Sequence, residues 1–279
     1  MNGLPERIKE IADAAGATGA AVALFDYQKA SQFSHCGDRW FHAASTIKVP
    51  LLLAVYRLAE EGRIRLDDTL HVRNRFRSLT GGIFRAAANR DGDSEVHRRR
   101  GRSMRVRELA RAMIVRSSNL ATNLLLDFVG PDEVRRLVAE ARLEGIELRR
   151  GVEDTAAFEQ GINNEVTADG LARCFRLLCQ EGFVRAETRE QMVEVLCAQE
   201  FNAMLPAHLP REARVAHKTG EISTVCHDAG IVFLPKRKPY VVAILTEWPA
   251  HIERRQGCVA AISRAAYEHV TGVSGKGAP

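Results

Sequence analysis

Long apolar segments are missing from this chain of 279 residues. The longest apolar run covers residues 49–56, whereas a helix that spans a membrane needs about 20 such residues. The first residues, 1–13, are charged and amphipathic and contain no apolar core like that of a secretory signal peptide. We therefore expect no membrane span, and a cytoplasmic protein, or a periplasmic or secreted one if a leader has been lost from the sequence.

Metal-binding clusters and nucleotide-binding loops are missing as well. None of the six cysteines belongs to a Cys-x-x-Cys pair, and no histidine stands at metal-ligand spacing from one of them. No Gly-rich phosphate-binding loop occurs. The sequence therefore implies no metal and no organic cofactor. Scattered cysteines in a chain of this size favour free thiols in a reducing compartment.

Lysine is scarce, with 7 residues against 33 arginines, and the arginines are unevenly spread. Residues 71–116 hold thirteen arginines but only four acidic residues. A surface for nucleic acid would mix aromatic rings among the basic side chains, and only Phe76 and Phe84 occur in this segment. We expect no nucleic-acid partner and interpret the segment as a solvated basic face.

Apolar periodicity predicts a chain that begins and ends with strands and is helical in between. The strands are expected at residues 18–25, 31–36, 215–218, 225–234 and 240–246. The helices are expected at residues 4–15, 45–61, 106–115, 119–129, 132–143, 167–180, 186–198 and 251–270. The two ends can share one sheet only if the helical block is an insertion. We therefore predict an α/β (α+β) domain from residues 1–43 and 205–279, an all-helical domain from residues 44–204, and a cleft where they join.

Ser45 and Lys48 form a Ser-x-x-Lys pair at the expected start of a long helix. Residues three apart lie on one face of a helix. A serine hydroxyl needs a base to become a good nucleophile, and a lysine whose pKa is depressed can serve. The N-terminus of a helix also offers backbone N–H groups to a developing oxyanion. Ser-x-x-Lys alone is common, so the pair requires support from elsewhere.

Two further motifs give that support. Ser117-Ser118-Asn119 precedes a leucine-rich helix, and Lys218-Thr219-Gly220 ends an expected strand. Ser-x-x-Lys, Ser-x-Asn and Lys-Thr-Gly in this order are the signature of class A β-lactamases and penicillin-binding proteins. The chain therefore resembles this superfamily.

The resemblance covers most of the chain and is weakest over residues 74–103. Residues 41–50, 117–125, 164–168 and 218–230 look like the corresponding stretches of class A β-lactamases. It implies the class A fold, in which terminal helices flank a five-stranded antiparallel sheet and an all-helical lobe is inserted. It also implies a monomer that acts on a small-molecule β-lactam or a peptide-like amide.

The resemblance assigns catalytic roles to four residues. Ser45 would be acylated and Lys48 would accept its proton, directly or through water. Ser117 would pass a proton to the leaving nitrogen, and Lys218 would tune the field around it.

Four further residues would bind the substrate. Asn119 would contact the side-chain amide of the substrate, and Thr219 would contact the substrate carboxylate. Gly220 and Glu221 continue this strand, and the backbone N–H groups of Glu221 and Ser45 would form the oxyanion hole.

Two positions depart from the family pattern. No acidic residue stands in register with the loop glutamate that activates the deacylating water in class A enzymes, and Glu153 and Asp154 are the nearest candidates. Asp228 occupies a position at which many class A enzymes place an arginine for the substrate carboxylate. Both departures predict slow turnover of β-lactams.

These observations leave three functions open. The first is a β-lactamase-like serine hydrolase, with slow deacylation. The second is a D-alanyl-D-alanine peptidase or esterase that forms the same acyl-enzyme. The third is a catalytically inactive binding domain whose basic segment contacts an acidic partner, and retention of all the catalytic side chains argues against it.

Overall fold

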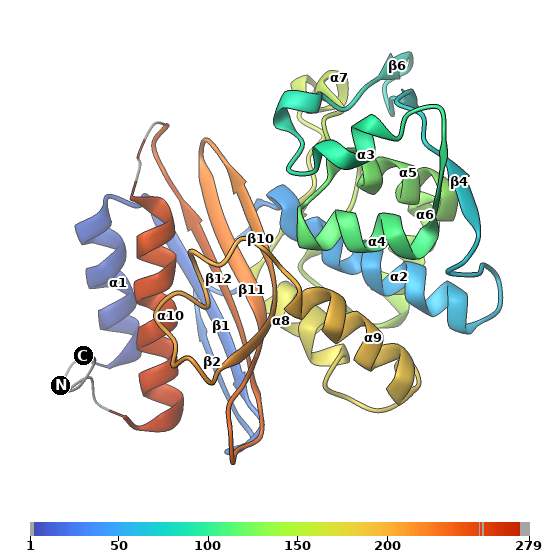
Figure 1. Cartoon of the computed structure of the whole chain (residues 1–279). Coiled ribbons are helices and arrows are strands. Elements are labelled where there is room, and N and C mark those ends of the chain that lie inside the picture. Colours follow the sequence, from blue (N-terminus) through green and yellow to red (C-terminus); the bar gives the residue numbers. More distant parts are fainter. Residues whose placement is uncertain (1–2, 251, 253, 274–279) are drawn as a thin grey trace. The chain divides into compact units, whose positions relative to one another are not determined.

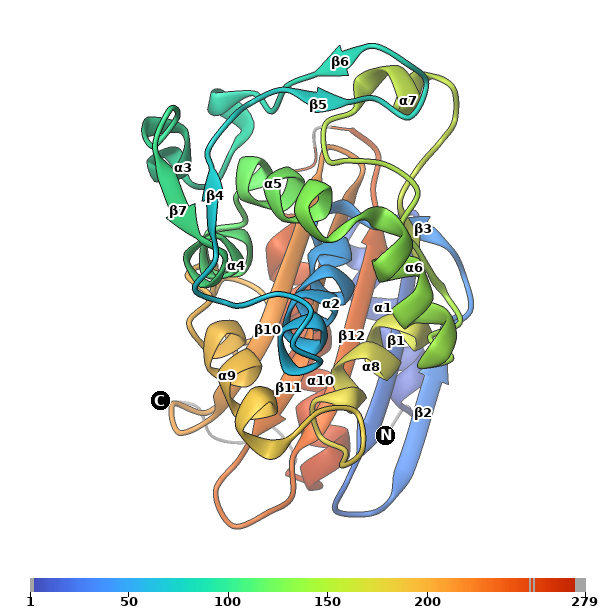
Figure 2. The same cartoon turned by 90° about the vertical axis from the view of Figure 1, so that its right-hand side faces the viewer.

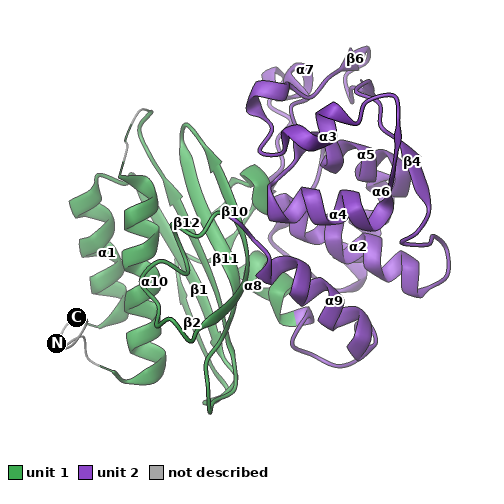
Figure 3. Ribbon diagram, viewed as in Figure 1, with its two compact units in different colours: residues 1–46, 166–176, 201–279 green, residues 47–165, 177–200 purple. Residues whose placement is uncertain are grey.

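A computed structural model describes residues 3–250, 252 and 254–273, and these residues divide into two units (Figure 3). Unit 1 contains the described residues of 1–46, 166–176 and 201–279, and unit 2 contains residues 47–165 and 177–200. The expected division differs in three segments, because residues 44–46, 166–176 and 201–204 belong to unit 1. Ser45 belongs to the unit that contains the sheet, and so does the segment 166–176, because both pack on the sheet through the contacts described below.

Unit 1 is built on a five-stranded sheet in which all neighbouring strands are antiparallel. Its order is β10-β11-β12-β1-β2, so the two ends of the chain supply all five strands, as expected. The strands are β1 (Gly19–Asp26), β2 (Ser31–His35), β10 (Arg214–Ile222), β11 (Val225–Phe233) and β12 (Tyr240–Glu247). β10 lies at one edge of the sheet.

Helices cover both faces of this sheet (Figure 1). The terminal helices α1 (Leu4–Ala15) and α10 (Arg255–Thr271) pack side by side on one face. Ile8, Val242 and Ile262 belong to the apolar core between these helices and the sheet. On the other face, Arg176 of α8 (Ala168–Leu177) lies over the ring of Phe25 at 3.8 Å. Because both faces are covered, β11 and β12 are apolar along most of their length.

Unit 2 is helical and is organised around α2 (Lys48–Glu60), which is buried over most of its length. Several helices pack against α2 and lie around it in Figure 2. They are α4 (Val106–Val115), α5 (Asn119–Val129), α6 (Pro131–Glu140) and α9 (Ala186–Cys197). Two short ribbons complete the unit, one from β4 (Thr69–His71) and β7 (Ser103–Arg105), the other from β5 (Phe76–Arg77) and β6 (Ile83–Phe84).

The remaining elements are short. They are β3 (Phe41–His42), η1 (Ala44–Ile47), η2 (Ala88–Arg90), α3 (Ser94–Arg98), β8 (Ile146–Glu147), α7 (Thr155–Glu159) and β9 (Glu165–Val166). The sequence predicted none of them as a separate element. Each has at most five residues, too few for a period of 2 or 3.6 to be recognised.

The predicted class A fold, with its five-stranded antiparallel sheet, terminal helices and helical insertion, is confirmed. One detail differs, because the helix expected at 45–61 begins as the 3₁₀ turn η1 and becomes α-helical at Lys48. Pro50 therefore lies in the first turn of α2, where its missing N–H costs no helical hydrogen bond. Residues 251 and 253 of the helix expected at 251–270 lie outside the described residues. In the part of the chain that is described, no helix combines the length and apolar character that a membrane span needs.

Candidate active site

Ser45 lies in the 3₁₀ turn η1, which leads directly into α2. The turn is closed by Ala43, whose carbonyl oxygen accepts hydrogen bonds from the backbone N of Thr46 at 3.1 Å and from its Oγ1 at 2.6 Å. Ala44 adopts a positive φ of 45°. Ser45 is half-buried and is followed by Lys48 three residues later.

Gly220 of β10 brings the edge strand against this turn. A Cβ atom at position 220 would stand 2.9 Å from Cγ2 of Thr46, 3.1 Å from its backbone N and 3.2 Å from the carbonyl oxygen of Ala43. Any larger residue would push the Ser45 turn away from the strand. The close approach explains why the Lys-Thr-Gly motif ends in glycine here.

His227 fastens the start of the turn to the sheet. Its Nε2 donates to the carbonyl oxygen of His42 at 3.0 Å, and its Nδ1 accepts from the backbone N of Thr246 at 3.1 Å. This donor and acceptor pair fits the neutral imidazole. Burial of the ring lowers the pKa of His227 to about 4. In turn, Nδ1 of His42 accepts from the backbone N of Ala44 at 3.0 Å, so both histidines position the turn.

We expect His227 to make the fold sensitive to acid. An unfolded histidine has a pKa of about 6.5. Between pH 6.5 and 4 this histidine is therefore protonated in the unfolded chain but stays neutral in the folded protein. The resulting stability is complete above pH 6.5 and is lost as the pH falls towards 4, by about 3 kcal/mol for a shift of this size. Urea unfolding between pH 7.5 and 4.5 measures it. His227→Gln, which keeps a neutral donor and acceptor, should flatten this part of the slope, and an unchanged slope would contradict the assignment.

Lys218 and Thr219 are buried on β10, next to Gly220. Lys218 Nζ donates to the carbonyl oxygen of Thr219 at 2.9 Å. Burial lowers the pKa of Lys218 to about 7, and the charge of Asp228 partly opposes that shift. The side chain of Glu221 turns towards α10, where Arg255 donates to it at 2.8 Å and Gln256 at 2.9 Å.

Lys48 joins two residues of the Ser-x-Asn motif within unit 2. Its Nζ donates to Ser117 Oγ at 3.1 Å, to the carbonyl oxygen of Ser117 at 2.8 Å and to Asn119 Oδ1 at 2.8 Å. Lys48 is fully buried, whereas Ser117 and Asn119 are half-buried. The structure thus brings three of the predicted site residues into one hydrogen-bonded cluster.

Glu153 belongs to the same cluster. Asn119 Nδ2 donates to Glu153 Oε1 at 2.6 Å, and the backbone N of Ala87 donates to Glu153 Oε2 at 2.7 Å. Asn119 therefore links Nζ of Lys48 to the carboxylate of Glu153. Glu153 has a positive φ of 65°, which is uncommon for a residue with a side chain and fixes the direction of this loop.

The other acidic candidates of this loop lie outside the cluster. Asp154 is fully buried and caps α7, and it also accepts from Ser78 Oγ at 2.8 Å and from the backbone N of Leu79 at 3.1 Å. Glu159 is exposed at the end of α7. Of the acidic residues of this loop, only Glu153 is bonded to Asn119 in the part of the chain that is described.

Asp228 is fully buried in a hydrogen-bonded cluster. Both carboxylate oxygens lie 3.0 Å from Nδ1 of His217, and Oδ2 accepts from the backbone N of Leu205 at 3.0 Å. Asp228 pairs with Thr219 across the two strands, so it lies on the face of Thr219 and His217, whereas Lys218 points to the other face. The repulsion of a substrate carboxylate by Asp228 stays a prediction.

Comparison with known proteins agrees with this geometry. The model of the beta-lactamase enzyme family matches residues 3–270. The chain belongs to this family. The match extends over both units of this member of the beta-lactamase family and includes every site residue predicted from the sequence.

Individual relatives are distant but cover much of the chain. The extended-spectrum beta-lactamase PER-1 of Pseudomonas aeruginosa is 24% identical over 82% of this chain and 75% of its own length. A beta-lactamase from Sphaerobacter thermophilus has a TM-score of 0.81 and 26% identity, with 98% of each chain covered. A mutant of PBP-A, described as an acyl-enzyme complex with penicillin G, has a TM-score of 0.81 and 25% identity, with 97% of each chain covered.

Two residues that support the beta-lactamase-like cluster escaped the sequence analysis. The buried Asp91 accepts from Ser118 Oγ at 3.2 Å and from the backbone N of Leu120 at 2.9 Å, which orders the start of α5. Asn123 binds both the backbone N and the carbonyl oxygen of Val152 at 2.8 Å, next to Glu153. Asn123 follows Asn119 by four residues, so their shared helix face was the available signal. No pattern in the sequence pointed to Asp91.

Proposed function

We propose that the protein is a serine hydrolase that opens β-lactam amides through an acyl-enzyme on Ser45 and releases the product slowly. The observation that carries this proposal is the contact of Lys48 Nζ with both Ser117 Oγ and Asn119 Oδ1. This amine links the proton-transferring hydroxyl to the residue that binds substrate. Membership of the beta-lactamase family supports the same chemistry.

In the proposed acylation, Ser45 Oγ attacks the carbonyl carbon of the lactam and its proton passes to Lys48. The C–N bond then breaks, and the ring nitrogen takes a proton through Ser117. The oxyanion is stabilised by the backbone N–H groups of Ser45 and Glu221. Thr219 contacts the substrate carboxylate, and Lys218 tunes the field around Ser117. The product of this half-reaction is an ester of Ser45 with the opened ring.

In the proposed deacylation, a water molecule attacks the carbonyl carbon of this ester and Glu153 takes its proton. The bond between this carbon and Ser45 Oγ then breaks, Oγ takes up the proton, and the ring-opened acid leaves. A general base must lie within hydrogen-bond reach of the water. Both oxygens of Glu153 already accept hydrogen bonds, from Asn119 and from Ala87. Each oxygen keeps a second lone pair for the water. Because Glu153 is out of register with the family glutamate, we expect it to meet the water poorly and the acyl-enzyme to be long-lived.

Deacylation can be tested with benzylpenicillin and two matched variants. We expect a burst of one equivalent followed by slow turnover in the wild-type protein. Glu153→Gln should lengthen the life of the adduct by about 10²-fold, the lower range for loss of a general base, while acylation keeps its rate. Glu159→Gln removes an exposed acid of the same loop and should change neither rate. Quenched-flow mass spectrometry measures both steps, and rapid turnover without a burst would contradict the proposal.

A D-alanyl-D-alanine peptidase or esterase is the second candidate. It uses the same acyl-enzyme, and a Glu153 carboxylate held by Asn119 and Ala87 is compatible with a site that does not turn over β-lactams quickly. Hydrolysis of a depsipeptide ending in D-alanine, at a rate well above that for benzylpenicillin, would favour this candidate.

A further inference from the structure

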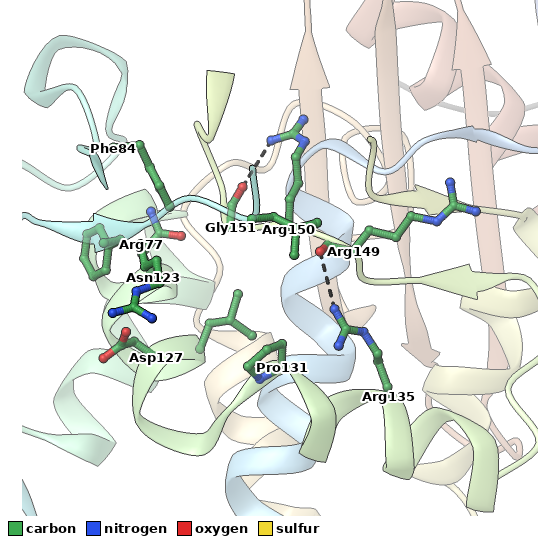
Figure 4. A pocket seen from close by; sticks show the side chains of 12 residues that line it. Arg77, Phe84, Asn123, Asp127, Pro131, Arg135, Arg149, Arg150 and Gly151 are labelled. Carbon is green, nitrogen blue, oxygen red and sulfur yellow. Dashed lines mark hydrogen bonds between the residues drawn. The ribbon is translucent and has the colours of Figure 1, made fainter. Parts of the chain in front are cut away.

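A pocket in unit 2 is lined in part by residues 149–151, which lead along the chain to Glu153. Its empty volume is about 540 Å³ when the open solvent at its mouth is included. Its walls come from the β5–β6 ribbon, from α5 and α6, and from residues 149–151 (Figure 4). None of the proposed catalytic residues lines it.

One part of the pocket is apolar and aromatic. The rings of Phe76 and Phe84 lie 5.6 Å apart, centroid to centroid, with an angle of 39° between their planes. Leu126 and Pro131 line the side formed by α5 and α6. Aromatic walls of this kind favour a flat ring, which can stack in an offset or edge-to-face arrangement.

Two guanidinium groups stand at opposite sides of this apolar part (Figure 4). Within the described residues, no carboxylate forms an ion pair with Arg77. Arg135 pairs at 2.5 Å with Asp132, whose side chain is 91% exposed, and it also donates to the carbonyl oxygens of Leu148 at 3.1 Å and Arg149 at 3.4 Å. A guanidinium has five N–H donors, so part of the donor capacity of Arg135 is left for a ligand. Arg73 neutralises Asp127, the acidic residue of the lining. A ligand carboxylate would therefore meet Arg77 and the remaining donors of Arg135, which suit it geometrically.

The remaining two arginines of the lining are already engaged. Arg149 pairs with Glu147 and, at 3.4 Å, with Glu165. Arg150 is buried and donates to the carbonyl oxygens of Ile162 at 2.8 Å and Gly151 at 3.1 Å. Arg149 and Arg150 therefore line the pocket without binding the ligand carboxylate, which we assign to Arg77 and Arg135.

From this juxtaposition we infer that the pocket is a binding site for a small aromatic carboxylate, with its ring against Phe76 and Phe84 and its charge between Arg77 and Arg135. This site is separate from the proposed acylation of Ser45 and does not depend on it.

The occupied pocket would also hold the Glu153 loop. Phe84 packs so closely on Gly151 that a Cβ atom there would stand 2.5 Å from the ring. Val152 follows Gly151 and is bracketed by Asn123. A ligand ring that packs on Phe84 would therefore lie next to Gly151 and Val152, and the backbone amides of these two residues would report its binding.

Calorimetry with 2-naphthoate tests the inference, and the neutral 2-naphthamide serves as the matched ligand. We expect one saturable site and binding of the carboxylate about tenfold tighter than that of the amide, the effect of one charge-assisted contact. Arg77→Gln and Arg135→Gln should each weaken 2-naphthoate about fivefold or more. Arg136→Gln, on the next residue of α6 and outside the lining, should leave the affinity unchanged.

Amide NMR shifts separate this pocket from any binding at the Lys-Thr-Gly strand. Shifts induced by 2-naphthoate should be largest at Gly151 and Val152, and hydrogen exchange of the Val152 amide should slow. Three results would overturn the inference: no saturable binding, equal affinity for the amide, or shifts confined to Thr219 and Gly220. Because calorimetry and shifts need no turnover, an inactive protein that binds 2-naphthoate would refute the proposed function and leave this site intact.

Discussion

Ser45→Ala should abolish turnover of β-lactams, with a loss of about 10⁴-fold or more. The alanine lacks the oxygen that forms the ester, and the backbone N–H groups near position 45 cannot replace it. The turn itself should survive, because hydrogen bonds between Ala43 and Thr46 close it and Gly220 packs against it. Initial rates with a chromogenic cephalosporin measure the loss.

Ser117→Ala is the matched control for this variant. It removes the hydroxyl that accepts a hydrogen bond from Lys48 Nζ, but it leaves the Ser45 nucleophile in place. We expect it to slow acylation while an adduct still forms on Ser45. Substantial residual turnover by Ser45→Ala at unchanged melting temperature would show that another residue carries the chemistry.

Lys48→Arg and Lys218→Arg should differ sharply, although each replaces one cation by another. Lys48 is proposed as the base, and a guanidinium stays protonated at all working pH values. We therefore expect Lys48→Arg to lower the acylation rate about 10³-fold, in the range for loss of a general base. Lys218 acts through its charge, so Lys218→Arg should keep the acylation rate within about tenfold.

The pH dependence separates the two lysines further. Burial lowers the pKa of Lys218 to about 7, so its charge is lost as the pH rises through neutrality. The second-order acylation rate of the wild-type protein should fall with an apparent pKa near 7, and Lys218→Arg should remove this fall. Stopped-flow acylation between pH 5.5 and 9 measures both variants. Equal tolerance of arginine at the two positions would contradict the distinction.

The motifs could be recognised in the sequence because acyl transfer to serine requires particular side-chain groups. Ser45, Lys48 and Lys218 must supply a hydroxyl and two amines at defined spacings, and a short pattern records this. The long helices were equally accessible, since α4 and α5 begin and end where their apolar period does.

The loop around Glu153 shows where prediction from the sequence stops. Counting along the family pattern found no acid in register, yet Glu153 reaches Asn119 because its positive φ and the anchors at Asn123 and Ala87 set the path of the loop. These contacts join segments that are 29 to 66 residues apart, and no local period encodes them.

Asp228 shows a second limit. Its position suggested repulsion of a substrate carboxylate, but the sequence could not show which groups bind its oxygens. Pairing of Thr219 with Asp228 places the carboxylate on the face of His217, where Leu205 also binds it. A spacing of ten residues after Lys218 could not show that this side chain is buried.

The central claim is a covalent bond between a β-lactam carbonyl and Ser45. Benzylpenicillin is added, the reaction is quenched after seconds, and intact mass spectrometry followed by peptide mapping locates the adduct. We predict an increase equal to the whole antibiotic, carried by the peptide that contains Ser45 and absent from Ser45→Ala. An unmodified protein at all times with no product formed, or an adduct on Ser117, would contradict the account.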